Sequence, residues 1–509
     1  MVRIKFNFVD ISVVITLLLI SFSGCGKQEN KLETDILAQV GEHTINVTEF
    51  LLNYEFGFAN LKKNPDRKLS YLDFMINEKL LSLEGYRLGL DKTEHLQILE
   101  KRLLQELLVE EIFKNEVDEK IKISPEEIKE AISKSTVGWK LRYWVRPTLE
   151  ASEYLFRAMQ ERGNTKMAQE NLETDYLTWM DFPPELLESI KNLEIGELSE
   201  PVEYNRAYYL FQVTDILREG ISDYDYQYTY KRYEQILYYR KLNLETTKFV
   251  SNFMTPKNVV TKGKTFQIFA DALAEWRKQG KNAYSFSESL EKAGNTEPAM
   301  QHLNDNLEKT FIIFDGGQWS LKVFITHFNP ASVKIDPSKA EHFRRELKHQ
   351  IALSIRDYFL AKEAAEQGLD KSPDVREQLQ MWRDKWVYEE TRRFFTKNVE
   401  IDETTALNYF NNHKSRFKTV NGNEPTFREF ENLTKRYAYI EKSQSLLEEK
   451  IRSLKKEFTV HINQAMLDKV SVIDFEKSRW AHLLLFKRGS GRLALPSVDP
   501  TWGFEANYN

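Results

Sequence analysis

The feature that most constrains this chain is an internal repeat. Residues 86–132 and 365–410 share the same order of features: Gly-Leu-Asp-Lys, a long helical pattern, a short polar cap and a second helical pattern. Upstream of these, residues 40–51 and 314–325 both combine a tight turn, a short strand and the start of a helix. Because order and cap chemistry repeat together, the sequence predicts two copies of one helical module.

Apolar residues at three- and four-residue spacing run along both copies, which is typical of amphipathic helices. The stripes consist of Leu96, Leu99, Leu103, Leu107 and Phe113 in the first copy, and of Val375, Leu379, Trp382 and Trp386 in the second. Ser124, Pro125 and Glu127 mark a strong helix start. Serine caps the first turn, proline fits the first helical position, and an acid is favoured there.

Residues 139–215 interrupt the helical pattern between the two copies. A strand pattern ends at Pro147, two amphipathic helical patterns follow, and residues 208–216 are rich in β-forming side chains. The order strand, helix, helix, strand predicts a compact α/β domain closed by antiparallel strands. The expected fold is therefore mostly α, with one inserted small α/β domain.

The predicted organisation has seven parts. They are a signal peptide (1–24), a tether (25–34), a helical module (35–135), the α/β domain (136–218), a helical connector (219–310), a second helical module (311–470) and a C-terminal tail (471–509). The tail carries Trp502 and Phe504, which we expect to be exposed. Its residues 479–509 are expected either to lie across the protein's own helices or to dock on a fixed protein partner.

The N-terminal residues predict where the protein is located. Arg3 and Lys5 precede an apolar stretch that is too short to span a membrane, which takes ~20 residues. The following Phe22-Ser23-Gly24-Cys25 resembles a lipobox, with phenylalanine in place of the usual leucine, so Cys25 would be lipidated. We expect a lipid-anchored, periplasm-facing protein of the bacterial envelope. The non-acidic Gly26 favours the outer membrane, and plain secretion is the alternative.

Composition excludes several classes of function. Cys25 is the only cysteine, so an internal disulfide or a cysteine-based metal site is excluded. The net charge of −5 argues against nucleic-acid binding, and the membrane would be reached through the lipid rather than a basic face. No nucleophile–base pair, phosphate-binding loop or carboxylate pair stands out. We therefore expect no cofactor and no metal.

Several segments resemble a known family. Residues 40–50 (VGEHTINVTEF), the helix after Gly-Leu-Asp and residues 123–132 (ISPEEIKEAI) resemble the chaperone module of the SurA/PrsA/PpiD group of envelope foldases. Residues 193–213 (LEIGELSEPVEYNRAYYLFQV) resemble the second half of a parvulin, or PpiC-type, peptidyl-prolyl isomerase domain. The resemblance implies SurA-like helical modules with one inserted parvulin-like domain, and the second copy resembles a module without its insert.

The resemblance also indicates a site. In that family two histidines on adjacent strands support an apolar proline pocket, and these positions fall on Tyr143 and Tyr209. The pocket positions fall near Phe182 and Leu186, with Trp179 beside them. Because both histidines are absent, the resemblance implies a degenerate domain. The five residues are expected to form a proline- or client-binding groove, and none of them is expected to be catalytic.

The expected function comes from the resemblance. It is a membrane-anchored periplasmic chaperone or foldase that holds unfolded or nascent envelope polypeptides, with weak or lost isomerase activity. Two alternatives stay open. One is an active peptidyl-prolyl cis–trans isomerase. The other is a structural lipoprotein subunit of an envelope complex with one fixed partner.

Overall fold

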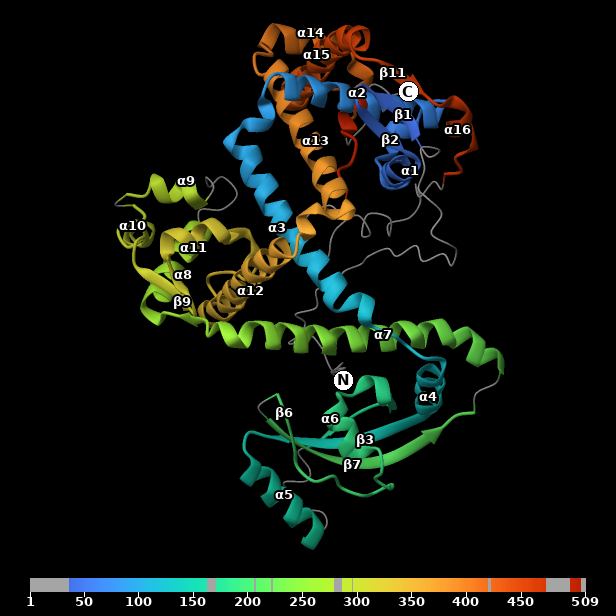
Figure 1. Cartoon of the computed structure of the whole chain (residues 1–509), viewed down its shortest axis with the longest axis vertical. Coiled ribbons are helices and arrows are strands. Elements are labelled where there is room, and N and C mark those ends of the chain that lie inside the picture. The colour runs from blue at the N-terminus through green and yellow to red at the C-terminus, as the bar shows by residue number, and fades with distance from the viewer. Residues whose placement is uncertain are drawn as a thin grey trace. The chain divides into compact units, whose positions relative to one another are not determined.

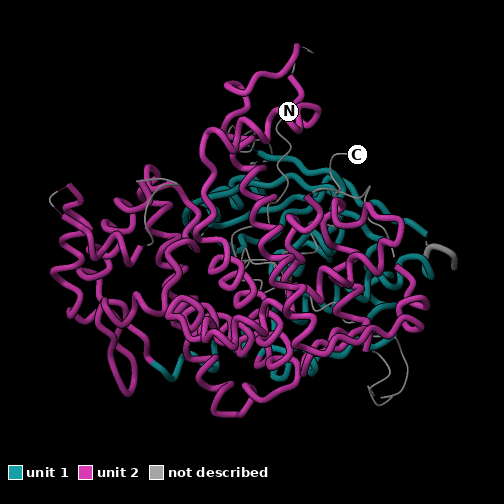
Figure 2. The backbone as a smooth tube through the Cα atoms, turned by 90° about the horizontal axis from the view of Figure 1, so that it is seen from above, with its two compact units in different colours: residues 1–14, 113–257 teal, residues 15–112, 258–509 magenta. Residues whose placement is uncertain are grey.

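The structure is a computed structural model, and it falls into two compact units (Figure 2). Unit 1 comprises residues 1–14 and 113–257, and unit 2 comprises residues 15–112 and 258–509. The described residues are 36–162, 171–205, 207–220, 223–278, 286–294, 296–419, 423–472 and 495–504. The predicted signal peptide, the tether with Cys25, and most of the predicted tail lie outside them.

Unit 1 is built on a long antiparallel strand pair, β3 (Val137–Arg146) and β7 (Ala207–Arg218), visible in Figure 1. The shorter strands β4 (Leu172–Glu173) and β5 (Leu177–Thr178) pair with β3, and β6 (Val202–Tyr204) pairs with β7. The helices of this unit are η4 (Asp118–Lys120), α4 (Pro125–Ser135), α5 (Leu149–Arg162), η6 (Trp179–Asp181), α6 (Pro184–Ile190), α7 (Asp223–Met254) and η7 (Thr255–Lys257). The predicted order strand, helix, helix, strand is confirmed by β3, α5, α6 and β7.

The predicted start of α4 is confirmed in atomic detail. The Ser124 hydroxyl accepts a hydrogen bond from the Glu127 amide at 3.2 Å, and the Glu127 carboxylate accepts one from the Ser124 amide at 2.8 Å. Pro125 occupies the first turn. Because this reciprocal cap satisfies two amides that the helix leaves free, α4 begins at a defined residue and buries Ile128 and Ile132 against the sheet.

Unit 2 contains the same series of elements twice. The first series is β1 (Ile36–Val40), β2 (His43–Asn46), α1 (Val47–Phe56), η2 (Ala59–Lys62), α2 (Arg67–Arg87), η3 (Leu90–Lys92) and α3 (Glu94–Glu116). The second series is β9 (Thr310–Phe314), β10 (Gly317–Ser320), α11 (Leu321–His327), η9 (Pro330–Ser332), α12 (Ala340–Glu366), η10 (Leu369–Lys371) and α13 (Pro373–Thr396). The repeat read from the sequence is therefore a repeat of structure.

Local chemistry repeats with the elements. Gly89 and Gly368 stand directly before η3 and η10 with φ angles of 72° and 79°, a conformation that favours glycine. Asn46 and Ser320 cap the helices that come after the two hairpins. These residues let each long helix end and the next begin at a sharp turn, so both copies fold along the same path.

The two copies lead into different structures. The first continues through α4 into the α/β domain, whereas the second passes from α14 (Glu403–Asn412) through η11 (Lys414–Arg416) to α15 (Phe427–Glu457), with no strand between them among the described residues. The remaining elements of unit 2 are β8 (Val260–Thr261), α8 (Gly263–Lys278), α9 (Phe286–Glu291), α10 (Pro298–Asn304), β11 (Val460–Ile462), α16 (Gln464–Lys469) and η12 (Pro500–Gly503).

The small sheet of each copy contains a third strand that follows the other copy in the sequence. Strand β11, C-terminal to the second copy, completes the sheet β11-β1-β2 of the first, with Val460 opposite Val40. Strand β8, C-terminal to the first copy and its insert, completes the sheet β10-β9-β8 of the second, with Val260 opposite Ile313. Since neither sheet reaches three strands without the other copy, the two copies fold as one unit.

The matching apolar stripes pack on one another. Leu103 and Leu107 of α3 form one buried cluster with Val375 and Trp382 of α13, and Leu379 and Trp386 lie against it. Counted from the repeated Gly-Leu-Asp, Leu103 and Trp382 occupy the same position in the two copies. The predicted stripes therefore serve as the packing surface between copies.

The described part of the tail corrects one expectation. Residues 495–504 lie on the helices of unit 2 itself, where Phe504 is buried and Trp502 is half-buried. These aromatic residues are therefore not exposed as the sequence suggested, because Trp502 stacks on Phe74 and Phe504 packs on Tyr437. For these ten residues the structure favours the intramolecular alternative.

Candidate functional site

The five residues of the predicted groove come together in one apolar cluster of unit 1. Tyr143 lies on β3, Tyr209 on β7, Trp179 in η6, Phe182 directly after η6, and Leu186 on α6. Tyr209 is partly buried and the other four are buried. The five side chains therefore share one apolar cluster, and they are more enclosed than an open groove requires.

The two tyrosines occupy one face of the sheet. Strand pairing places Phe211 opposite Tyr143 and Tyr209 opposite Val145, so Tyr143 and Tyr209 are diagonal neighbours on adjacent strands. Their ring centroids lie 6.5 Å apart, and Tyr209 stacks on Phe211 at 6.0 Å. Burial raises the pKa of both tyrosines above the usual value, so the hydroxyls stay protonated at neutral pH. The two tyrosines and Phe211 together form an aromatic stack on this face of the sheet.

Trp179 is enclosed by α4 and α7. Its indole Nε1 donates a hydrogen bond to the Ala131 carbonyl at 3.0 Å. The Arg240 guanidinium lies 4.3 Å from the ring centroid and donates to the Met180 carbonyl at 2.8 Å. Helices α4 and α7, both outside the predicted α/β domain, therefore hold the segment in which a proline pocket was expected. The binding role of the five residues stays a prediction.

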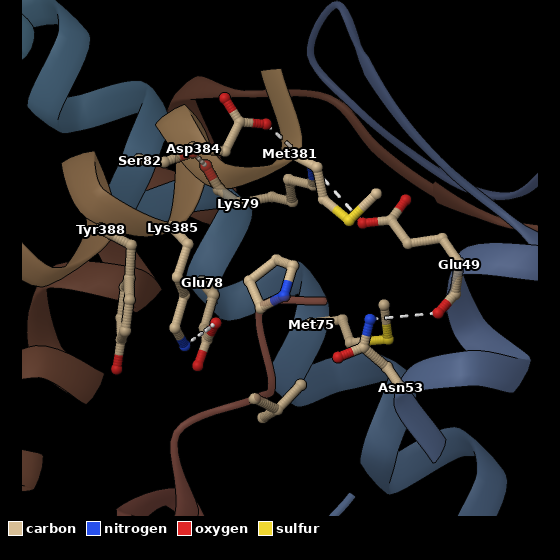
Figure 3. Close-up of a pocket in the computed structure, with 12 residues that line it drawn as sticks. Glu49, Asn53, Met75, Glu78, Lys79, Ser82, Met381, Asp384, Lys385 and Tyr388 are labelled. Atoms are coloured by element: carbon tan, nitrogen blue, oxygen red, sulfur yellow. Dashed lines mark hydrogen bonds and ion pairs between the residues drawn. The ribbon is translucent and has the colours of Figure 1, made fainter. Parts of the chain in front are cut away.

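Unit 2 contains a second candidate site, which is polar and which the sequence analysis missed. A cavity of about 40 Å³ lies between α1, α2, α13 and the tail segment (Figure 3). Such a volume accommodates water but no drug-sized ligand. The lining residues are Glu49, Asn53, Met75, Glu78, Lys79, Ser82, Met381, Asp384, Lys385, Tyr388, Pro496 and Val498.

Lys79 is the centre of the first group of charges beside this cavity. Its Nζ lies 2.8 Å from the Asp384 carboxylate and 3.6 Å from the Glu49 carboxylate. Burial alone would raise the pKa of Asp384, but His43, 3.4 Å away, and Lys79 hold it well below the usual value. Burial raises the pKa of Glu49. The Lys79 ammonium thus pairs with two carboxylates, Glu49 on α1 and Asp384 on α13.

A second pair lies one residue away on each helix. Lys385 of α13 lies 2.7 Å from the Glu78 carboxylate of α2, and burial raises the pKa of Glu78 despite this partner. The pairs 78–79 and 384–385 therefore join the first copy to the second. A signal was present in the sequence, because Lys79 follows Tyr71 and Met75 at four-residue spacing, on the buried face of α2.

Other site types are not found in the described part of the chain. Its His, Cys, Asp and Glu residues form no group of three or more that could hold a metal ion. Its helices include none that is both long and apolar enough to cross a membrane.

Comparisons with known proteins give a limited likeness. No family model matches the chain, and no curated protein matches it. Among solved structures, the foldase protein PrsA from Streptococcus pneumoniae is similar at 14% identity and a TM-score of 0.22, covering 40% of this chain and 86% of that chain. The peptidylprolyl isomerase PrsA from Bacillus anthracis is similar at 14% identity and a TM-score of 0.19, covering 28% and 70%. The foldase protein PrsA from Lactococcus lactis is similar at 13% identity and a TM-score of 0.17, covering 45% and 96%.

Proposed function

We propose that this protein is a lipid-anchored chaperone of the bacterial envelope that holds unfolded polypeptides and has little or no peptidyl-prolyl isomerase activity. Its helical copies and inserted α/β domain would contact extended client segments through many weak apolar contacts. Release would result from folding of the client, so no nucleotide is required. Periplasm-facing attachment through Cys25, in the outer membrane by preference, is part of the proposal.

The observation that carries the proposal is the stack of Tyr143, Tyr209 and Phe211 on the face where the family places its histidines. Rotation about an X-Pro bond has a barrier of about 20 kcal/mol, so an isomerase must preferentially stabilise the twisted amide. Residues 136–218 contain no histidine at all. Tyr143 and Tyr209 keep an aromatic surface at these positions and stay protonated at neutral pH, where the resemblance implies two titratable imidazoles. This combination supports binding rather than turnover.

Apolar side chains exposed on unit 1 also support a binding function. Tyr154 on α5, Ile195 after α6 and Tyr228 on α7 are 63%, 61% and 80% exposed. Tyrosine offers large, rigid contact area at a low cost in conformational entropy. Tyr226, Tyr230 and Tyr233 of the same helix instead pack into the apolar cluster of unit 1, so only part of the tyrosine-rich segment is available to clients.

The function is tested with residues 26–509. Two-dimensional NMR exchange would measure cis–trans interconversion of an X-Pro bond in a short peptide, and light scattering would monitor aggregation of a chemically unfolded enzyme. We expect exchange at the rate without protein, together with suppressed aggregation at a near-equimolar ratio. Exchange clearly above background would make the protein an active isomerase. If the protein neither speeds exchange nor suppresses aggregation, the structural subunit of an envelope complex becomes the better account.

Attachment to the membrane is tested at Cys25. In bacterial cells fed with a labelled fatty acid, the wild-type chain is expected to take up label and to sediment with membranes. The Cys25→Ser variant is expected to lose all label and to move to the soluble periplasmic fraction. Ser23→Ala, two residues earlier, is the control and should remain labelled. If Cys25→Ser still took up label, the lipid would be attached at another residue and the proposed attachment through Cys25 would be wrong.

A further inference from the structure

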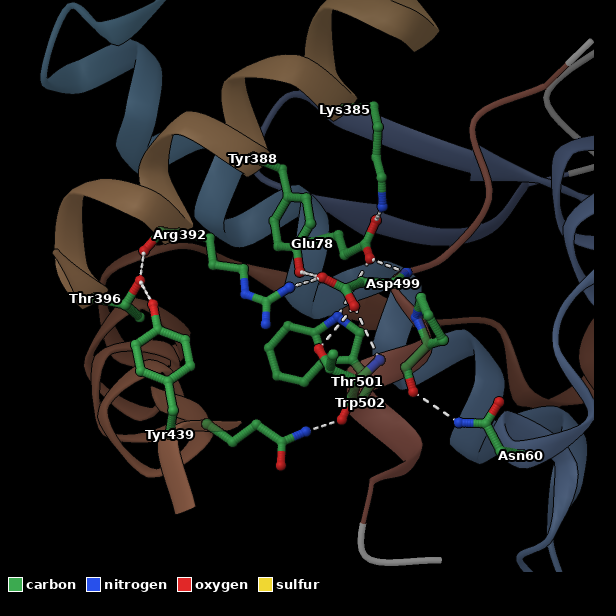
Figure 4. A network of polar contacts seen from close by, with 12 residues as sticks. Asn60, Glu78, Lys385, Tyr388, Arg392, Thr396, Tyr439, Asp499, Thr501 and Trp502 are labelled. Atoms are coloured by element: carbon green, nitrogen blue, oxygen red, sulfur yellow. Dashed lines mark hydrogen bonds and ion pairs between the residues drawn. The ribbon is translucent and has the colours of Figure 1, made fainter. Parts of the chain in front are cut away.

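The last described segment of the chain lies in a groove of unit 2 formed by η2, α2, α13 and α15 (Figure 4). It has no regular secondary structure up to Asp499 and ends in the single turn η12. Pro496, Val498, Gly503 and Phe504 are buried, and the other residues of the segment are at least partly exposed. A bound peptide lies on a receptor in a similar way, with some side chains inserted and others at least partly exposed to solvent.

Side chains of the groove bind the backbone of the segment. Asn60 donates a hydrogen bond to the Pro500 carbonyl at 2.7 Å, and Gln444 donates one to the Thr501 carbonyl. The Asp499 amide donates to the Glu78 carboxylate at 2.7 Å. Contacts to backbone groups are available to any extended polypeptide, so these three give affinity without fixing the sequence of the ligand.

One position of the groove selects an acidic side chain. The Asp499 carboxylate accepts a hydrogen bond from the Tyr388 hydroxyl at 3.0 Å and pairs with the Arg392 guanidinium. Burial alone would raise the pKa of Asp499, but Arg392 and the hydrogen bonds from Thr501 hold it below the usual value. A neutral residue here would leave the partly buried Arg392 without this carboxylate.

A second position selects an aromatic side chain three residues further on. The Trp502 ring stacks on Phe74 at 6.4 Å, and its indole nitrogen donates to Glu78 at 3.2 Å. Glu78 is also paired with Lys385 at 2.7 Å, so this acceptor keeps a cation when no peptide is present. The hydrogen-bond acceptor of the groove is therefore already charged and held in place before a peptide binds.

The other end of the segment forms only part of the cavity wall. Pro496 and Val498 line the cavity of about 40 Å³ together with Met75 and Met381. Methionine side chains are flexible and adapt to differently shaped apolar partners. This end therefore has room for side chains larger than those of the tail.

We propose that the groove is a peptide-binding site of the chaperone and that residues 495–504 are its built-in occupant. The ligand would be a client segment that follows the backbone path of the tail, with an acidic residue at the position of Asp499 and an aromatic residue three positions later. Such a segment displaces the tail. The inference rests on the proposed chaperone function and names the place and the chemistry of client binding.

The test uses a fluorescein-labelled peptide, LPSVDPTWGF, and fluorescence anisotropy with residues 26–509. The tail is loosened by Asp499→Ala together with Gly503→Ala, because a Cβ at position 503 would lie 2.6 Å from the Asn60 carbonyl oxygen. The groove itself is unchanged in this variant. Ser497→Ala is the matched control, since Ser497 makes none of the contacts described above.

The loosened variant is expected to bind the peptide at least tenfold more tightly than the wild-type chain and Ser497→Ala, which both retain the tail. Adding Arg392→Gln to the loosened variant should remove most of this gain. A peptide with asparagine in place of its aspartate should lose a similar factor. A folded loosened variant that binds no better than the wild type would overturn the inference and make the tail a fixed part of unit 2.

A second measurement on the unmodified chain covers the case in which the loosened variant does not fold. Excess unlabelled peptide is expected to speed amide hydrogen exchange in residues 499–504 without changing exchange in α8. Unchanged exchange in the tail would contradict the inference. A failure of the proposed function can be told apart from a failure of this inference. The function is tested by suppression of aggregation by the wild-type chain, and the groove is tested by peptide binding.

Discussion

Replacing Lys79 with methionine is expected to lower the free energy of unfolding of unit 2 by about 3–5 kcal/mol. Methionine nearly keeps the length of lysine but removes the charge that Asp384 and Glu49 share at 2.8 and 3.6 Å. Both carboxylates line the cavity between α1, α2 and α13, where the Asp384 side chain is 6% and the Glu49 side chain 16% exposed, so water replaces the lost cation only in part. The loss would be measured as a lower midpoint of urea unfolding, monitored by circular dichroism.

Lys362→Met on α12 is the matched control. Lys362 lies 3.8 Å from Glu366, but the two side chains are 59% and 62% exposed, so water screens the pair. The same substitution should change stability there by no more than about 0.5 kcal/mol. If Lys79→Met also changed stability by less than that amount, the buried charges would not hold the copies together. Adding Asp384→Leu should recover part of the loss, because it removes one of the two carboxylates that have lost the lysine cation.

Local chemistry explains why so much of the fold was predictable. The capping residues at 124–127 and the two Gly-Leu-Asp turns act over a few residues, so their effect is read directly from the sequence. The same holds for β3 and β7, whose alternating side chains place Tyr143 and Tyr209 on one face. The mostly α fold with a small α/β insertion is confirmed on these grounds.

Long-range pairing could not be read in the same way. Strand β11 pairs with β1 across more than half of the chain, and nothing in the residues Val460–Ile462 specifies which sheet they complete. The tail shows the same limit, because its sequence gives no sign that Phe74 receives Trp502 or that Tyr437 receives Phe504. A local pattern says that a residue needs a partner, and only the fold says which one.

The candidate site contains features that the sequence predicted and features that depend on long-range contacts. The family resemblance alone led to the five residues of unit 1, and it could not show that Ala131 and Arg240 enclose Trp179. The charges at 78–79 and 384–385 were overlooked for a related reason. A lysine on an apolar helix face is usually read as a solvent-exposed edge, and its partner lies in the other copy, roughly three hundred residues away.

Gly85→Ala is expected to lower the free energy of unfolding of unit 2 by about 1–3 kcal/mol, although alanine is the better helix former. Gly85 lies where α2 crosses α13, and a Cβ there would be 2.5 Å from Val387 Cγ1 and would also overlap the Thr391 hydroxyl. Val387 and Thr391 are β-branched and buried, so neither can rotate away. The helices must therefore separate, which weakens the contact between the copies.

Gly263→Ala separates this steric effect from helix propensity. Gly263 is also helical, at the start of α8, and apart from its chain neighbours and the backbone of its own helix nothing lies within 4 Å of the position of an alanine methyl group. Alanine at this residue should leave the urea midpoint unchanged or raise it slightly. If Gly85→Ala were equally neutral, α2 and α13 would have room to spare at their crossing. A lower midpoint for Gly85→Ala alone would show that the two copies touch backbone to side chain, at a distance that only glycine allows.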